Sequence, residues 1–223
     1  MTRHDGKQAS APSAPSAPSA PSAPSAPSAP SAPPIRVLGL GGSLRRPSQS
    51  ETALRMALRG AKEAGAVTEL ISADALRLPL YPSPDMATDP KVVALLAAVR
   101  RADGLILASP AYHGTMSGVL KNALDYLQYL ADDEPPYLDG RAVGALSTGD
   151  GTQAVVQTVD ALRSVVHALR AWPTPIGVAI HEAGRTLQDG EVSDDRVAEL
   201  LRAMGAQVVE FALARRALRA AAP

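Results

Sequence analysis

The sequence predicts an α/β domain built on a doubly wound, five-stranded parallel sheet with helices on both faces. Three observations lead to this fold class. Along residues 35–223, short apolar segments alternate with longer segments of helical periodicity. The clearest apolar segment, Leu105–Ala108, lies between Gly104 and Ser109-Pro110, which is typical of a strand buried on both faces. A short loop and a helix with one apolar stripe, Met116–Leu127, then follow, as in a crossover unit.

The remaining strands are predicted from the same kind of apolar segment. In chain order the five strands are Ile35–Leu40, Val67–Ile71, Leu105–Ala108, Arg141–Leu146 and Pro175–Ile180. Pro110 has no N–H to donate, so the third strand should end there.

Helices are predicted between the strands from apolar stripes and capping residues. The first begins at Ser48 or Ser50 and ends before Gly65, and Ser48 with Glu51 fits a capping box. The second begins with Asp89 as N-cap and Pro90 as its first residue. The other three are Met116–Leu127, a helix through Val155–Leu169 that Trp172-Pro173 ends, and a long helix from about Ser193. His181–Glu191 is predicted to be a polar loop.

The N-terminal segment differs from the rest in composition. Residues 11–31 repeat Ala-Pro-Ser, and Ala32-Pro33-Pro34 end the tract. Such a segment cannot bury enough apolar surface to fold, so we expect residues 1–34 to be a disordered tail that favours polyproline II. A spacer is the favoured interpretation over a ligand for a proline-recognition module. The folded domain is expected at residues 35–223.

Composition excludes several functional classes. Lys and Arg total 22, as do Asp and Glu, so charge gives no case for nucleic acid or a membrane surface as partner. The absence of cysteine excludes disulfides and thiolate chemistry, and the four histidines have no metal-ligand spacing, so no metal site is expected. No segment is as long as a membrane span and the N-terminus lacks a secretory apolar region. We therefore expect a cytoplasmic protein.

Two loops follow predicted strands and carry polar residues suited to a ligand. The loop Gly41–Ser50 combines glycines, hydroxyls and arginine at a helix start, which suits a phosphate monoester. Leu44 stands where the dinucleotide fingerprint needs its third glycine, and no Gly-Lys-Ser/Thr triplet occurs. The alternative is a glycine turn with two solvated arginines. The second loop, Ala111–Gly114, follows the third strand, where ligands of such sheets bind.

Three motifs resemble those of the NAD(P)H-dependent FMN reductase family, the flavodoxin-like flavin, quinone and azo reductases. They are the Gly42-Ser43-x-Arg45-x-x-Ser48 loop, the Ser109–Gly114 loop, and Leu120-Lys121-Asn122-Ala123-x-Asp125. The resemblance implies a flavodoxin-like fold with strand order 2-1-3-4-5, whose switch point lies between strands one and three. It also implies FMN as cofactor and NADPH or NADH as co-substrate.

The resemblance, together with the glycines after the fourth strand, gives the candidate FMN-binding residues. They are Ser43, Arg45, Ser48, Gln49, Ser50, Pro110, Ala111, Tyr112, His113, Gly114, Ser147, Thr148, Gly149 and Gly151. No catalytic side chain is expected, because the chemistry would take place at the flavin N5.

The implied partners are a small-molecule electron acceptor (a flavin, quinone or azo compound) and a flavin-dependent monooxygenase that receives reduced FMN. A homodimer or homotetramer is also implied, in which the helix of Asp125 takes part because Tyr126, Tyr129 and Leu130 extend its apolar surface. Two alternatives remain open, namely a flavodoxin-like electron carrier and a non-catalytic binding or scaffold protein.

Overall fold

A computed structural model of the chain describes Thr2, residues 32–83 and residues 88–221. By its contacts the chain divides into two units, Met1–Pro33 and Pro34–Pro223, and every helix and strand given below belongs to the second. The tail predicted at residues 1–34 lies almost entirely outside the described residues, so its disorder stays a prediction.

The sheet has the predicted parallel topology. Its five strands lie in the order β2-β1-β3-β4-β5, and all four strand pairs are parallel. The strands are β1 (Arg36–Gly41), β2 (Val67–Ile71), β3 (Gly104–Pro110), β4 (Ala142–Thr148) and β5 (Trp172–Ile180). The prediction is confirmed, with shifts of one to two residues at the ends of β1, β3 and β4.

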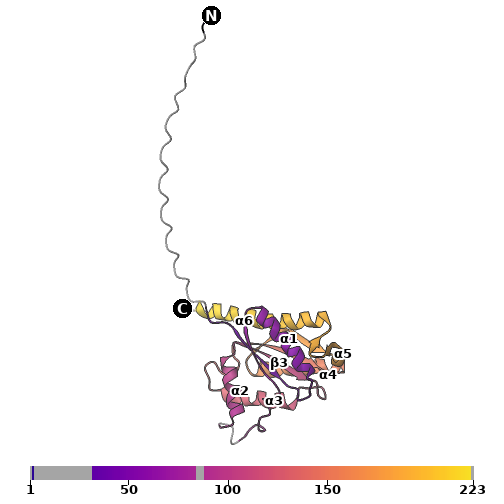
Figure 1. Cartoon of the computed structure of the whole chain (residues 1–223). Coiled ribbons are helices and arrows are strands. Elements are labelled where there is room, and N and C mark those ends of the chain that lie inside the picture. Colours follow the sequence, from indigo (N-terminus) through magenta and orange to yellow (C-terminus); the bar gives the residue numbers. More distant parts are fainter. Residues whose placement is uncertain (1, 3–31, 84–87, 222–223) are drawn as a thin grey trace. The chain divides into compact units, whose positions relative to one another are not determined.

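Helices cover both faces of the sheet, as predicted. In Figure 1, α1 and α6 lie together on one face, and α2 and α3 lie on the other. The helical elements are α1 (Gln49–Glu63), α2 (Pro90–Arg101), α3 (Gly118–Asp125), the 3₁₀ turn η1 (Tyr126–Leu130), α4 (Thr152–Ala168), α5 (Ala183–Thr186) and α6 (Asp195–Ala220). None of these helices is long and apolar enough to cross a membrane.

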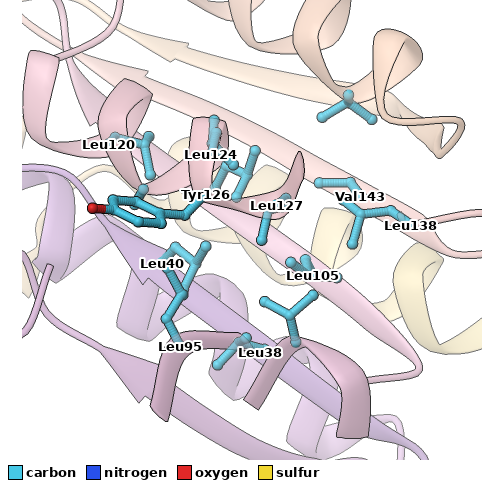
Figure 2. Close-up of a cluster of buried hydrophobic side chains, with 14 of the residues drawn as sticks. Leu38, Leu40, Leu95, Leu105, Leu120, Leu124, Tyr126, Leu127, Leu138 and Val143 are labelled. Carbon is cyan, nitrogen blue, oxygen red and sulfur yellow. The ribbon is translucent and has the colours of Figure 1, made fainter. Parts of the chain in front are cut away.

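The central strand β3 divides the apolar core into two layers. Its residues alternate between faces, so that Leu105 and Leu107 pack under α2, α3 and α4 while Ile106 and Ala108 pack under α1 and α6. All seven residues of β3 are buried. Figure 2 shows the first layer, where leucines from the strands and from α2 and α3 surround Tyr126.

The fifth strand begins earlier than predicted. Trp172-Pro173 does not end a helix, because α4 ends at Ala168 and Trp172 is already the first residue of β5. The N–H of Trp172 donates to the carbonyl of Arg141 at 2.9 Å, so the nitrogen of the next residue, Pro173, faces away from β4. On this edge strand the missing N–H of proline costs no hydrogen bond, which is why the sequence signal was misleading.

The apolar residues that follow Asp125 belong to the core of the domain itself. The predicted helix Met116–Leu127 is divided into α3 and the turn η1. Tyr126 and Leu130 are fully buried, and the Tyr126 hydroxyl donates to the carbonyl of Pro79 at 3.1 Å. Tyr126 and Leu130 therefore extend no apolar surface for subunit contact, while Tyr129 is half-buried with its ring against that of Tyr81. Participation of this helix in a subunit contact stays a prediction.

The segment predicted as a polar loop, His181–Glu191, contains regular structure. It holds α5 and an antiparallel pair, β6 (Leu187–Gln188) and β7 (Glu191–Val192). Asp189 and Gly190 connect the two strands with φ of 52° and 80°, the conformation that an Asp-Gly hairpin turn requires. The Asp-Gly dipeptide was the available sequence signal.

Helices α1 and α6 approach so closely that only glycine fits at the crossing. A β-carbon at Gly205 would overlap the carbonyl of Ala57, and one at Gly60 would overlap the backbone of Arg202. This contact fixes the position of α1, and with it the loop that precedes α1.

We predict that Gly205→Ala lowers the free energy of unfolding by about 3 kcal/mol, the upper range for overpacking, because backbone cannot yield as a side chain can. Chemical denaturation measures the change. Gly118→Ala is the control, since nothing lies within 4 Å of a β-carbon there, and it should cause no loss. Equal stability of the two variants would contradict the close crossing.

Candidate functional site

The loop after β1 is held against the start of α3. The N–H of Gly42 donates to the carbonyl of Ala108 in β3 at 2.8 Å. A β-carbon on Gly42 would lie only 2.8 Å from the Ser117 hydroxyl, so glycine is needed for this approach. The loop therefore leaves the sheet at the carboxyl ends of β1 and β3, the predicted switch point.

The start of α1 supplies backbone donors to this loop. Ser48 is the N-cap, and its hydroxyl accepts from the N–H of Glu51 at 3.1 Å. Ser50, the rival N-cap, lies inside the helix with its buried hydroxyl 3.4 Å from that of Ser48. The first N–H groups of a helix, here those of Gln49 and Ser50, have no intrahelical acceptor and carry partial positive charge.

The two adjacent arginines of the loop have different surroundings. Arg46 forms an ion pair with Asp74, which follows β2. Arg45 has no carboxylate within 4 Å among the described residues, and its guanidinium carbon lies 5.9 Å from the centroid of the Tyr112 ring. Of the two, Arg45 is thus the arginine whose charge is available to an anion, and it connects the first loop with the second.

A pocket of about 270 Å³ lies between the β1 loop and the end of β2. Three predicted residues line it, namely Ser43, Arg45 and Ser48. The other lining residues were not predicted from the sequence; they are Arg46, Pro47, Glu51, Thr52, Arg55, Ser72, Ala73, Asp74 and Gly190. The pocket thus combines hydroxyls with three guanidinium groups, of which those of Arg46 and Arg55 are paired with the carboxylates of Asp74 and Glu51.

The loop after β3 forms a tight turn on the surface. Tyr112 and Thr115 exchange two backbone hydrogen bonds, of 2.9 and 3.1 Å. Between them His113 and Gly114 have φ of 52° and 81°, so the turn is of the primed type. Tyr112 is 37% exposed and His113 is exposed. The turn therefore presents an aromatic ring at the edge of the sheet.

The loop after β4 lies directly beside that turn. The N–H of Ala111 donates to the carbonyl of Thr148 at 2.8 Å, and Pro110 pairs with Thr148 in the sheet. A β-carbon on Gly149 would lie 3.2 Å from that of Ala111, so close packing requires this glycine. Gly151, the N-cap of α4, has open space around its α-carbon.

The Ser147 hydroxyl, at the carboxyl end of β4, is buried and finds no hydrogen-bond partner in the part of the chain that the structure describes. Buried polar atoms without a partner are rare in folded proteins. Its strand neighbour Ser109 is satisfied, since its hydroxyl accepts from the N–H of Ser117 at 2.9 Å and donates to the carbonyl of Pro110.

The predicted residues therefore form two adjoining parts of one site. Ser43, Arg45, Ser48, Gln49 and Ser50 surround the start of α1, and Pro110–Gly114 with Ser147–Gly149 and Gly151 form the neighbouring strand ends. The second part does not line the 270 Å³ pocket; its Tyr112 and His113 are exposed, whereas Pro110, Ser147 and Thr148 are buried. Among the described residues no three His, Asp or Glu side chains are grouped as metal ligands would be.

This arrangement suits a ligand with an anionic end and a flat apolar end. The helix start, the hydroxyls and Arg45 suit a phosphate, because each donates hydrogen bonds or positive charge. The Tyr112 turn and the small residues Ala111 and Gly149 allow a planar ring to lie against backbone.

Comparison with known proteins gives matches along most of the second unit. Residues 35–185 match the profile of the family described as NADPH-dependent FMN reductase. The chain is 31% identical to an NAD(P)H-dependent FMN reductase of Pseudomonas aeruginosa over 172 residues, which cover 75% of this chain and 90% of that protein. It is 32% identical to an NADPH azoreductase of a Bacillus species over 119 residues, or 53% of this chain and 62% of that one.

A solved structure agrees with the fold. The flavoenzyme NAD(P)H:(acceptor) oxidoreductase FerB of Paracoccus denitrificans superposes with a TM-score of 0.66 at 19% identity, covering 81% of this chain and 98% of that one. The likeness, together with the strand order, shows a flavodoxin-like fold.

We predict that Ser48→Ala lowers the free energy of unfolding by about 1 kcal/mol, because the N–H of Glu51 loses its acceptor. Thermal and denaturant melts measure the change. Ser48→Asn is the matched control and should retain most of the stability, since asparagine also caps helices well. If alanine proved as stable as serine, the cap would not contribute to holding the start of α1.

Proposed function

The chain belongs to the NADPH-dependent FMN reductase family, and from this membership we propose how its residues hold the cofactor and which acceptors it serves. It is an FMN-dependent NAD(P)H oxidoreductase with a flavodoxin-like fold. Bound FMN would supply the redox chemistry, through which reducing equivalents would pass from NAD(P)H to a second substrate.

The start of α1 binds the FMN phosphate in this proposal. Ser43, Ser48 and the N–H groups of Gln49 and Ser50 donate hydrogen bonds, and Arg45 supplies the positive charge. The support is geometric, since α1 is a 15-residue helix whose start borders a pocket that Ser43, Arg45 and Ser48 line. Arg46 is assigned no such role because Asp74 already pairs with it.

The two neighbouring strand ends support the isoalloxazine ring. Pro110–Gly114 and Ser147–Gly149 with Gly151 would hold the ring between them in this proposal. The orphaned Ser147 hydroxyl supports this assignment, because a ring carbonyl or nitrogen would give it a partner. The exposed Tyr112 and His113 would give the nicotinamide and then the acceptor a route to the ring.

No side chain of the chain is assigned an acid or base role. Its residues bind the phosphate, support the ring and exclude water from one ring face, while the cofactor carries the electrons. The acceptors that we propose are free flavins, quinones and azo compounds, with a flavin-dependent monooxygenase as a recipient of reduced FMN. The name of the Bacillus relative supports the azo class.

The proposal extends to assembly and location. A homodimer or homotetramer is favoured by Leu80, which is 82% exposed, and by the exposed Tyr112 ring at the site. Use of NAD(P)H, a co-substrate kept inside cells, favours the cytoplasm. Sedimentation velocity at micromolar concentration tests the assembly, and a strict monomer would overturn that part.

The observation that carries the function is the unpaired Arg45 beside the start of α1 and the Tyr112 turn. We predict that the purified chain binds FMN and that anaerobic NADPH bleaches the bound flavin. Addition of a quinone should then restore the flavin absorption. Visible spectroscopy follows both steps, and free FMN without protein is the control. A chain that takes up no flavin on mixing would instead be a binding or scaffold protein.

We predict that Arg45→Ala weakens FMN binding by about 1.5–3 kcal/mol, the range for hydrogen bonds to charged groups. Riboflavin, which lacks the phosphate, should bind the variant and the unaltered protein about equally. Turnover at saturating FMN should be largely retained.

Arg46→Ala is the matched control for this substitution and should affect FMN binding less, because its charge is paired with Asp74. Fluorescence quenching of FMN and of riboflavin measures both affinities. Unchanged FMN affinity with collapsed turnover would place Arg45 in the reaction and not at the phosphate.

A further inference from the structure

A second pocket lies at the amino ends of the strands, the opposite edge of the sheet from the flavin site. It has a volume of about 260 Å³ and lies between the end of α2, the segment before β4 and the last turns of α6. The described residues that line it are Arg100, Arg101, Ala102, Asp103, Pro135, Asp139, Gly140, Arg141, Ala212, Arg215, Arg216 and Arg219. Six of these twelve are arginines, which no role in the flavin site explains.

The positive charge of this pocket exceeds the negative charge around it. Arg100 pairs with Asp133 at 2.8 Å, Arg101 lies 3.5 Å from Glu69, and Arg216 lies 3.5 Å from Asp103. With Asp139, four carboxylates of the described residues face six guanidinium groups, an excess of two positive charges within that part of the chain. The ends of α2 and α6 add about half a negative charge each, which the arginines still outweigh.

Two of the arginines converge over one glycine and have no carboxylate partner. A β-carbon on Gly140 would lie 3.0 Å from an Nη of Arg219 and 3.2 Å from an Nη of Arg215. Neither guanidinium has a carboxylate oxygen within 4 Å among the described residues. The Nε of Arg215 is buried and has no hydrogen-bond acceptor. Buried donors of this kind need a partner, and an anion in the pocket would supply one.

Arg141 adds a third guanidinium from the start of β4. Its Nη1 donates to the carbonyl of Tyr137 at 3.1 Å, and within residues 32–83 and 88–221 no carboxylate forms an ion pair with it. Burial lowers the pKa of Arg141 from its ordinary value, Asp103 opposes this effect, and the nearby Arg219 adds to it. The repulsion from Arg219 agrees with the geometry, since both charges face the same small volume.

We propose that this pocket is a binding site for a small phosphorylated anion, held by Arg141, Arg215 and Arg219. A tetrahedral phosphate offers oxygens in three directions to three guanidinium forks, whereas a planar carboxylate offers only two oxygens. The volume is below the range of about 300–1,000 Å³ typical of drug-sized ligands, so a phosphate ester or pyrophosphate fits better than a second dinucleotide.

Stabilisation of the C-terminus of α6 explains only part of the arrangement of the arginines that line this pocket. Arg215, Arg216 and Arg219 lie in the last turns of α6, where positive charge stabilises a helix C-terminus. That role is fulfilled by side chains extended into solvent, and it does not require Arg215 to bury its Nε without an acceptor or to lie against Gly140.

The test is calorimetric titration of the full chain with inorganic pyrophosphate. The protein is first saturated with FMN, so that the phosphate loop after β1 is occupied. We expect one binding site per chain and an affinity about tenfold lower in Arg219→Gln and in Arg215→Gln. Arg202→Gln is the matched control, because Arg202 is on the same helix outside the pocket, and it should bind as the unaltered chain does.

Three results would overturn the proposal. They are absence of pyrophosphate binding to the FMN-saturated chain, equal loss in Arg202→Gln, and citrate binding as tightly as pyrophosphate. The shift of the melting temperature by pyrophosphate gives a second measurement, which a structural role would not move. If Arg215→Gln proves unstable, the exposed Arg219→Gln carries the test. The first of these results, combined with binding of a DNA duplex, would show that the pocket belongs to a nucleic-acid surface.

Discussion

Burial of β3 on both faces is the constraint on which the rest of the molecule depends. Because its seven residues are all buried, β3 must have a helical layer on each side, and each layer needs its own apolar core. The strand ends at Pro110, and the N–H of Gly42 donates to Ala108 just before that end. The loops after β1 and β3 are thereby brought to one point, and the N–H of Ala111 adds the loop after β4. The candidate site is the meeting point of these three loops.

Most of the fold could be predicted because its signals are local. The strand at Leu105–Ala108 needed only an apolar run with Gly and Pro at its ends, and the start of α2 needed only Asp89 before Pro90. The predictions were wrong where a segment distant in the sequence determines burial or secondary structure. From the sequence, Tyr126 was predicted to be a surface residue, but in the structure the segment around Pro79 covers it. Trp172-Pro173 was predicted to end a helix, but it begins a strand at the edge of the sheet. In both cases the residues that determine the outcome, around Pro79 and Arg141, lie far away in the sequence.

The candidate site likewise contains groupings that are local in the sequence and contacts that distant segments make. The hydroxyls and Arg45 lie within one loop, so their grouping could be predicted from spacing alone. The different surroundings of Arg45 and Arg46 could not, because the carboxylate that pairs with Arg46 comes from Asp74, after β2. Gly190 reaches the same pocket from the β6–β7 turn, which is more than a hundred residues further along the chain. A pocket assembled from three separate segments has no single sequence signature, although each of its parts does.

The two edges of the sheet differ in what they offer an anion. At the carboxyl edge the helices α1 and α4 begin, and their first N–H groups already attract negative charge, so that one unpaired arginine, Arg45, suffices beside them. At the amino edge the helices α2 and α6 end, and their last carbonyl groups repel negative charge. An anion site there has to be made from side chains, which accounts for six arginines around a pocket of similar size. The two pockets thus lie at opposite ends of the strands, and the lining of the arginine-rich pocket shares no residue with that of the pocket beside α1.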